Sequence, residues 1–322
     1  MRKLASLFVL PLFCLASALA QPLPQEDGIR MREFYRLSAA VENDVWPNWS
    51  QIPAPLLLVT PQGEFLTHYS APPKSFTRIG DDIYVRPRQF PVNLQATFPA
   101  FGPSAVIVIG EPENTSSKTS TPWLVTVTHE HFHQLQDSQP HYFDDVEHLG
   151  LSRGDQTGMW MLNYPFPYQD VSQAFSHVRD LLLAATSESD AQKFEHAAQE
   201  YIAARKQFFA KLSPDDRKYL SFQLWYEGIA RYTELKVAEA AANYHPTAEY
   251  AALPDYQSFA EYAGKVKRNS LDELRDADIG KLKRLVVYPW GAGEGLLLDR
   301  LNEGWRKEYF AHPFSLDFFF EQ

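Results

Sequence analysis

The pattern of the sequence changes at TPWLVTVTHEHFHQLQD, residues 121–137. Thr121 followed by Pro122 is typical of a helix start, because proline is tolerated at the first helical position. The helix is expected to end near Asp137, before Pro140. The valine and threonine residues inside it have poor helix propensity, so burial has to stabilise it. A strand-like chain therefore becomes helical at this point.

Upstream, residues 21–119 contain short segments with the residue pattern of β-strands, and proline and glycine are frequent between them. Residues 56–60 and 64–69 flank Pro61-Gln62-Gly63 and predict a β-hairpin. Residues 82–86 and 105–109 predict two further strands. The first part of the chain is therefore expected to be rich in β-structure.

Downstream, apolar residues recur at helical spacing in residues 171–186 and 189–211, and again from Ser213 to about Asn243. The aromatic residues of 282–320 are expected to pack on the rest of the protein. These patterns predict an α+β domain over residues 21–322. Its lobe 21–140 is β-rich and contains the histidine helix, its lobe 141–322 is helical, and a cleft lies between them.

The composition is that of an ordinary globular protein, with 322 residues, 45% hydrophobic and 22% charged. The formal net charge of −10 gives no basic surface for nucleic acid, and no nucleic-acid-binding motif is present. We therefore expect no nucleic-acid partner. The oligomeric state is left open.

Residues 1–20 have the organisation of a signal peptide. Arg2 and Lys3 precede an apolar stretch, which is too short to cross a bilayer comfortably, and Ala18-Leu19-Ala20 supplies a cleavage site. We expect an exported protein, periplasmic or secreted, with no membrane span after cleavage. Cys14 is the only cysteine and lies in this segment. The mature chain would then hold any metal through nitrogen and oxygen atoms.

The centre of the quoted stretch has the pattern His-Glu-x-x-His. His129 and His133 lie four residues apart and project from one face of a helix, where two imidazoles can bind one zinc ion. Glu130 is placed to accept a proton from a water molecule beside the metal. His131 points away from His129, which predicts a surface histidine or one that supports a ligand.

A catalytic zinc ion needs a third protein ligand. A third histidine in the extended pattern is excluded because Gln139 occupies its position. Glu147 and His148 are possible replacements in a loop. The stronger candidate is Glu227, because a carboxylate on a largely apolar helix face needs a partner.

That partner is either a metal ion or Arg231, which lies four residues further along the same helix with Glu234 beyond it. Gly228 lowers helix propensity, and this indicates that another element approaches closely there. The histidine helix would fit.

His-Glu-x-x-His followed by Glu-Gly-x-Ala-x-Tyr, residues 227–232, resembles the gluzincin branch of the zincin metallopeptidases. The resemblance implies a zincin-like fold that binds one zinc ion through His129, His133 and Glu227. It also implies Glu130 as the general base and a peptide or protein substrate. In many gluzincins the third ligand follows the histidines much more closely, so residues 171–211 would be an inserted helical pair.

Other family features have weaker counterparts. Family members often place a tyrosine beyond the third ligand, and Tyr288 would stabilise the oxyanion there; the alternative is a packed core tyrosine. Residues 110–114 loosely resemble a loop that binds a substrate amine in exopeptidases, and otherwise form a solvated acidic loop. Residues 105–109 would be an edge strand that pairs with substrate, or else a buried strand of the sheet.

The main hypothesis is therefore an exported zinc metallopeptidase. One alternative is a zinc hydrolase that acts on other carbonyl compounds. Another is a catalytically inactive binding protein on a zincin scaffold.

Overall fold

The structure is a computed structural model, and it describes residues 22–321. The predicted signal peptide lies outside the described residues. Among the helices of 22–321, none has the length and apolar character needed to cross a bilayer.

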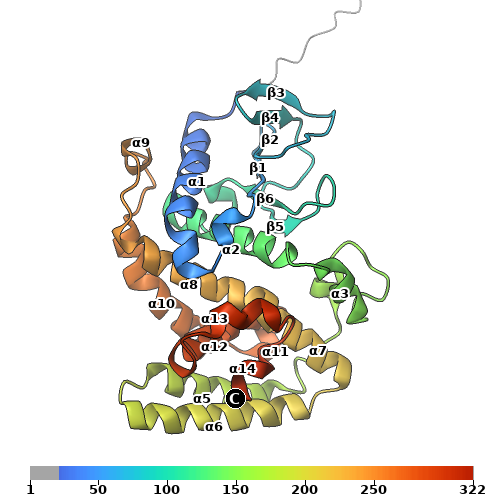
Figure 1. The fold of residues 1–322 in the computed structure, drawn as a ribbon, viewed down its shortest axis with the longest axis vertical. Helices are drawn as coiled ribbons and strands as arrows, with labels where there is room; N and C mark the ends of the chain where they lie inside the picture. Colours follow the sequence, from blue (N-terminus) through green and yellow to red (C-terminus); the bar gives the residue numbers. More distant parts are fainter. Residues whose placement is uncertain (1–21, 322) are drawn as a thin grey trace, which may run out of the picture.

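A six-stranded sheet occupies one end of the molecule, with strand order β3-β4-β2-β1-β6-β5 (Figure 1). The predicted hairpin is confirmed, because β1 and β2 pair antiparallel around the turn at 61–63. β1 and β6 pair in parallel, and the other neighbours are antiparallel. The bounds are β1 (Leu56–Val59), β2 (Glu64–Thr67), β3 (Thr77–Gly80), β4 (Ile83–Arg86), β5 (Gln95–Phe98) and β6 (Val106–Gly110).

Of the two alternatives for residues 105–109, the edge strand is wrong and the buried strand of the sheet is confirmed. β6 lies between β1 and β5, and all of its residues are buried. A continuous apolar run is typical of a strand covered on both faces, which an edge strand rarely is. β5 is the edge strand next to β6, and its residues are partly exposed; β3 forms the opposite edge.

The first lobe also contains a long helix that the sequence pattern did not predict, α1 (Gln25–Val45). It turns apolar side chains such as Phe34 and Leu37 into the core. Charged side chains are buried on the same helix, among them Arg30, which pairs with Asp27 at 2.8 Å. These charges interrupt the apolar stripe, so the helical period was hidden. The α+β class is confirmed, but the first lobe is less rich in β-structure than predicted.

α2 (Ser120–Asp137) is the predicted histidine helix, and it begins two residues earlier than expected. It contacts β5 and β6 on one side and α8 on the other. In Figure 1 it therefore lies between the sheet and the helical part of the molecule. This position brings α2 into contact with both lobes.

The three predicted helices of the second lobe are confirmed as α5 (Ser172–Ser187), α6 (Ala191–Ala210) and a long helix starting at α7 (Pro214–Gln223). The Ser213 hydroxyl caps this helix by accepting a hydrogen bond from Asp216 N at 3.2 Å. The long helix continues through a π-helical turn, Leu224–Gly228, into α8 (Ile229–Ala240).

Two further helices, α10 (Phe259–Asp276) and α12 (Val287–Leu301), pack on α8. Short helices complete the lobe: α3 (Tyr142–His148), α4 (Trp160–Asn163), α9 (Ala248–Ala251), α11 (Ile279–Leu282), α13 (Trp305–Glu308) and α14 (Asp317–Phe320). The remaining turns are of the 3₁₀ type and span Trp49–Gln51, Pro112–Asn114, Ala241–Asn243, Lys283–Val286 and Tyr309–Ala311.

One hydrophobic core runs through both lobes, from Ile29 in α1 to Phe320 near the C-terminus. The C-terminal aromatic residues pack into it as predicted, with Trp290, Trp305 and Tyr309 fully buried. The helix that carries the histidines is thus held by the packing of the whole chain.

Candidate metal centre

Three atoms that can ligate a metal converge between α2 and the π-helical turn, namely His129 Nε2, His133 Nε2 and a carboxylate oxygen of Glu227. The two Nε2 atoms are 3.1 Å apart. Glu227 Oε2 lies 3.4 Å from His133 Nε2 and 3.7 Å from His129 Nε2. Ligands about 2.0–2.1 Å from a tetrahedral zinc ion are separated by about 3.3–3.4 Å. The donor set and its spacing therefore fit zinc.

The π-helical turn places Glu227 toward the histidines. Leu224–Gly228 has the wider hydrogen-bonding pattern of a π-helix, which is frequent at functional sites. Gly228 is approached closely by α12, since a Cβ on Gly228 would lie 2.7 Å from Gly291 Cα. The predicted close approach is therefore confirmed, but the expectation that the histidine helix makes it is wrong.

The ring nitrogens that face away from the centre are also engaged. His133 Nδ1 lies 2.7 Å from Gln136 Oε1, while Gln136 Nε2 donates to the carbonyl oxygens of Trp225 and Tyr226 at 3.2 Å. Because the amide nitrogen is donating elsewhere, Gln136 Oε1 accepts the proton of His133 Nδ1. His133 Nε2 then presents its lone pair to the centre.

Glu234 orients His129 in the way that Gln136 orients His133. Its Oε1 lies 2.8 Å from His129 Nδ1, close although not aligned well enough for an ideal hydrogen bond. A carboxylate only accepts, so Nδ1 carries the proton and His129 Nε2 faces Glu227 and His133. Both histidines are thus oriented by a neighbour, as zinc-binding histidines are.

The electrostatic environment favours a positive charge at the centre. Burial lowers the pKa of His129, but Glu227 and Glu234 outweigh this effect and raise the pKa to about 10. Burial raises the pKa of Glu227, but contact with His129 and His133 outweighs burial and holds it well below its usual range. A centre that stabilises a proton in this way is suited to a metal cation.

Arg284 contacts the far side of the Glu227 carboxylate, with Nη1 3.0 Å from Oε1. The same guanidinium donates to Tyr288 OH at 3.2 Å through Nη2. Lys283, just before it, has a left-handed φ of 51°, a strained conformation for a residue with a side chain. Arg284 occupies Oε1 and leaves Oε2 of Glu227 for a metal.

Glu130 lies beside the centre and does not belong to the converging set. The Thr97 hydroxyl, on the edge strand β5, lies 2.9 Å from Glu130 Oε2. Burial raises the pKa of Glu130 above its usual value, more than the neighbouring histidines lower it. Such a carboxylate can accept a proton near neutral pH and release it again.

Tyr288 packs beside the centre. Its ring is roughly parallel to the His129 ring, with centroids 6.2 Å apart. It is partly exposed and lines the adjoining cavity. It is therefore not a fully buried core tyrosine.

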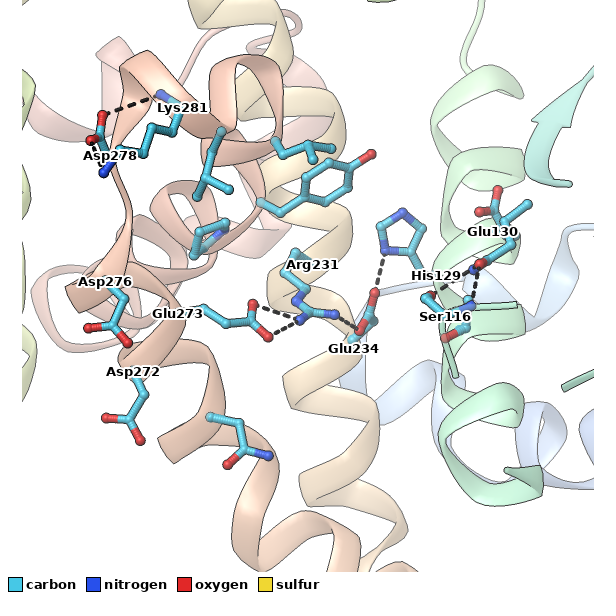
Figure 2. A pocket seen from close by; sticks show the side chains of 17 residues that line it. Ser116, His129, Glu130, Arg231, Glu234, Asp272, Glu273, Asp276, Asp278 and Lys281 are labelled. Atoms are coloured by element: carbon cyan, nitrogen blue, oxygen red, sulfur yellow. Dashed lines mark hydrogen bonds and ion pairs between the residues drawn. The ribbon is translucent and has the colours of Figure 1, made fainter. Parts of the chain in front are cut away.

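A cavity of about 1060 Å³ opens beside His129, Glu130 and Tyr288. Figure 2 shows His129 and Glu130 on one side and residues of α8 and α10 on the other. The lining includes residues from both lobes, so a cleft lies where the sequence predicted one. The lining residues are Gln95, Ser116, Thr126, His129, Glu130, Arg231, Glu234, Asn269, Asp272, Glu273, Asp276, Asp278, Lys281, Leu282, Leu285, Tyr288 and Pro289.

Two histidines considered for the site lie elsewhere. His131 is buried against α1, with Nε2 3.2 Å from Glu42 Oε1, so it neither lies on the surface nor supports a metal ligand. Glu147 and His148 lie on α3 instead of in a loop, and they are outside the converging set. Glu147 accepts a hydrogen bond from Ser152 at 2.8 Å.

The acidic loop at residues 110–114 is also not part of the cavity. Glu111 is buried, and burial together with Asp27 on α1 raises its pKa to about 7. Glu111 therefore does not line the cavity, as an amine-binding loop would require, and it does not lie in solvent either.

Three contributors were not recognised as such from the sequence: Gln136, Arg284 and Thr97. Glu234 was noted beside Glu227 but was given no role. Helical spacing connects Gln136 to His133 and Glu234 to Glu227, and could have indicated them. Arg284 and Thr97 come from other elements, and nothing in their local sequence indicates the centre.

Comparison with protein-family models, curated proteins and solved structures gave no match.

Proposed function

We propose that this protein is a zinc-dependent metallopeptidase of the gluzincin type. The observation that supports it most is the convergence of His129 Nε2, His133 Nε2 and Glu227 Oε2 within 4.8 Å of one another. Glu130 lines the cavity beside this centre, together with His129. The zincin-like fold and export from the cytoplasm belong to this proposal.

His129, His133 and Glu227 would hold the metal, with Gln136, Glu234 and Arg284 fixing the orientation of these ligands. A zinc ion bound there supplies a Lewis acid that activates water and polarises a substrate carbonyl.

Glu130 is the proton carrier in this proposal. Thr97 lies beside its Oε2, and no hydrogen bond from residues 22–321 reaches its Oε1. Oε1 would accept a proton from the attacking water and deliver it to the leaving amine. The pKa of Glu130, raised by burial, brings its affinity for a proton closer to the working pH.

Tyr288 would donate a hydrogen bond to the carbonyl oxygen as negative charge develops on it. Arginine only donates, so the contact from Arg284 Nη2 uses the Tyr288 oxygen as acceptor. The hydroxyl hydrogen of Tyr288 is then free to point into the cavity.

The unpaired edge of β5 favours a peptide over a small molecule as the substrate. Within residues 22–321, β5 pairs with β6 on one side only. An extended peptide can add to such an edge through main-chain hydrogen bonds. Thr97 of β5 touches Glu130, so a peptide bound along β5 would pass beside the proton carrier.

The test combines metal analysis with a Glu130→Gln variant. The purified mature chain should bind one equivalent of zinc and cleave members of a peptide library. Glu130→Gln should keep the zinc and lose about 10²- to 10⁴-fold in kcat, the usual contribution of a general base. Glu147→Gln, on α3 outside the cavity, is the matched control and should remain active. An active Glu130→Gln variant would disprove the mechanism, and cleavage of esters but not peptides would disprove the substrate class.

A further inference from the structure

One side of the cavity is lined by acidic residues of α10 and of the turn that follows it. We call Asp272, Glu273, Asp276 and Asp278 the acidic wall. In Figure 2 these four side chains lie across the cavity from His129 and Glu130. None of them is in the converging metal set.

Two of the wall charges are neutralised locally. Asp272 pairs with Arg275 on the same helix, and Asp278 pairs with Lys281 at 3.3 Å. Glu273 pairs with Arg231 at 2.9 Å, but Arg231 also pairs with Glu234 at 2.7 Å, so one cation serves two anions. Asp276 takes part in no ion pair within residues 22–321. The wall therefore retains negative charge at Glu273 and Asp276, one helical turn apart.

The wall is connected to the candidate metal centre through Arg231 and Glu234. A chain of contacts runs from Glu273 to Arg231 to Glu234 to His129, with lengths of 2.9, 2.7 and 2.8 Å. At the other end of the same cavity, Glu130 is only 6% exposed and its Oε1 accepts no hydrogen bond from residues 22–321. This oxygen is therefore open to a ligand bound in the cavity.

A second part of the lining is apolar. Leu282 and Leu285 are 39% and 55% exposed, unusually open for leucine, and both line the cavity together with Pro289. Isolated exposed leucines are ordinary, but this pair borders the same cavity as the acidic wall. The cavity thus offers one surface for a cation and one for an apolar side chain.

We infer that the cavity selects peptides that carry a cationic group beside a large apolar side chain, with the cation bound at Glu273 and Asp276. This inference rests on the proposed function. The cation is an ammonium or guanidinium, from a lysine or arginine side chain or from the peptide N-terminus. Negative potential inside a cleft is focused by the surrounding protein, and it repels anionic peptides as well as attracting cationic ones.

The test measures binding, so that it does not depend on cleavage. The probes are acetyl-Gly-Leu-Lys-Leu-Gly-amide and the same peptide with norleucine or glutamate in place of lysine. A fourth probe is the norleucine peptide with a free N-terminus. Calorimetry with the Glu130→Gln protein, zinc-loaded and metal-free, gives each Kd at low and high salt.

The lysine peptide should bind about tenfold more tightly than the norleucine peptide at low salt, as expected for one or two partly exposed ion pairs, and high salt should reduce the difference. The glutamate peptide should bind most weakly. Asp276→Asn alone, and Glu273→Gln with Asp276→Asn, should progressively remove the preference. Asp144→Asn with Asp145→Asn removes the same charge from exposed α3 and should leave the preference intact.

Equal Kd values for the lysine and norleucine peptides, with the free-amine probe showing no gain either, would overturn the inference. So would a preference that survives the double variant. A gain only for the free-amine probe assigns the wall to the peptide N-terminus and supports the inference. Charge preference without cleavage by the zinc-loaded wild type would refute the proposed function alone, whereas cleavage without charge preference would refute this inference alone.

Discussion

Two buried polar clusters lie in the second lobe and at its border, and they satisfy their charges in different ways. In the Glu294 network, Arg205 pairs with Glu294 at 2.6 Å and with Asp317 at 2.7 Å. Tyr201 also donates a hydrogen bond to Glu294. Each anion there meets a cation or a donor from the protein itself.

At the candidate metal centre the potential ligand atoms converge on one another instead. His129 Nε2, His133 Nε2 and Glu227 Oε2 lie together, while Gln136, Glu234 and Arg284 contact the atoms behind them. α12 contributes to both clusters, through Tyr288 at its start and Glu294 further along. Burial of charge alone therefore does not indicate a ligand site. Potential ligand atoms that converge beside a cavity do indicate one.

The largest effect should come from breaking the Glu294 network. Arg205→Met leaves Glu294 fully buried without its cation, which should cost about 3–5 kcal/mol in the free energy of unfolding. Urea unfolding followed by circular dichroism measures it. Arg217→Met is the control, because Arg217 pairs with the same Asp317 but is 49% exposed, and it should cost less than about 1 kcal/mol. Similar losses in both variants would contradict the contrast between the clusters.

The second-largest effect should come from binding zinc at the candidate metal centre. Zinc at a free concentration of 100 times its Kd should stabilise the folded protein by about 2.7 kcal/mol. Arg205→Met should gain the same increment, because the two clusters share no ligand. His133→Ala with Glu227→Ala should gain nothing, and stabilisation of that variant would place the zinc elsewhere.

A smaller effect should follow from changing a residue that orients a ligand. Glu234→Gln removes the negative charge next to His129 Nδ1 and should weaken zinc binding by about 10- to 100-fold, measured by competition with a chelator. Glu239→Gln, on the exposed face of α8, should bind zinc like the wild type. Equal affinities in the two variants would show that Glu234 does not orient His129.

Local sequence patterns predicted much of this structure. The hairpin at 56–69, the histidine helix and the long helices after residue 171 have strong periodicity or clear turn residues, and all are present. α1 was missed because charged residues interrupt its apolar stripe. The edge of the sheet was left open because strand order depends on pairing between distant segments, which no single strand encodes.

The sequence by itself determined the donor types of the candidate centre. His129 and His133 lie one helical turn apart whatever the rest of the chain does, and Glu227 needs a partner wherever its apolar helix is buried. Tertiary structure alone decided that these residues meet, through the π-helical turn and the Gly228–Gly291 contact. It also decided that Arg284 and Thr97 stand beside them. The physical reason is that helical spacing acts over a few residues, whereas convergence of three segments depends on how the core packs.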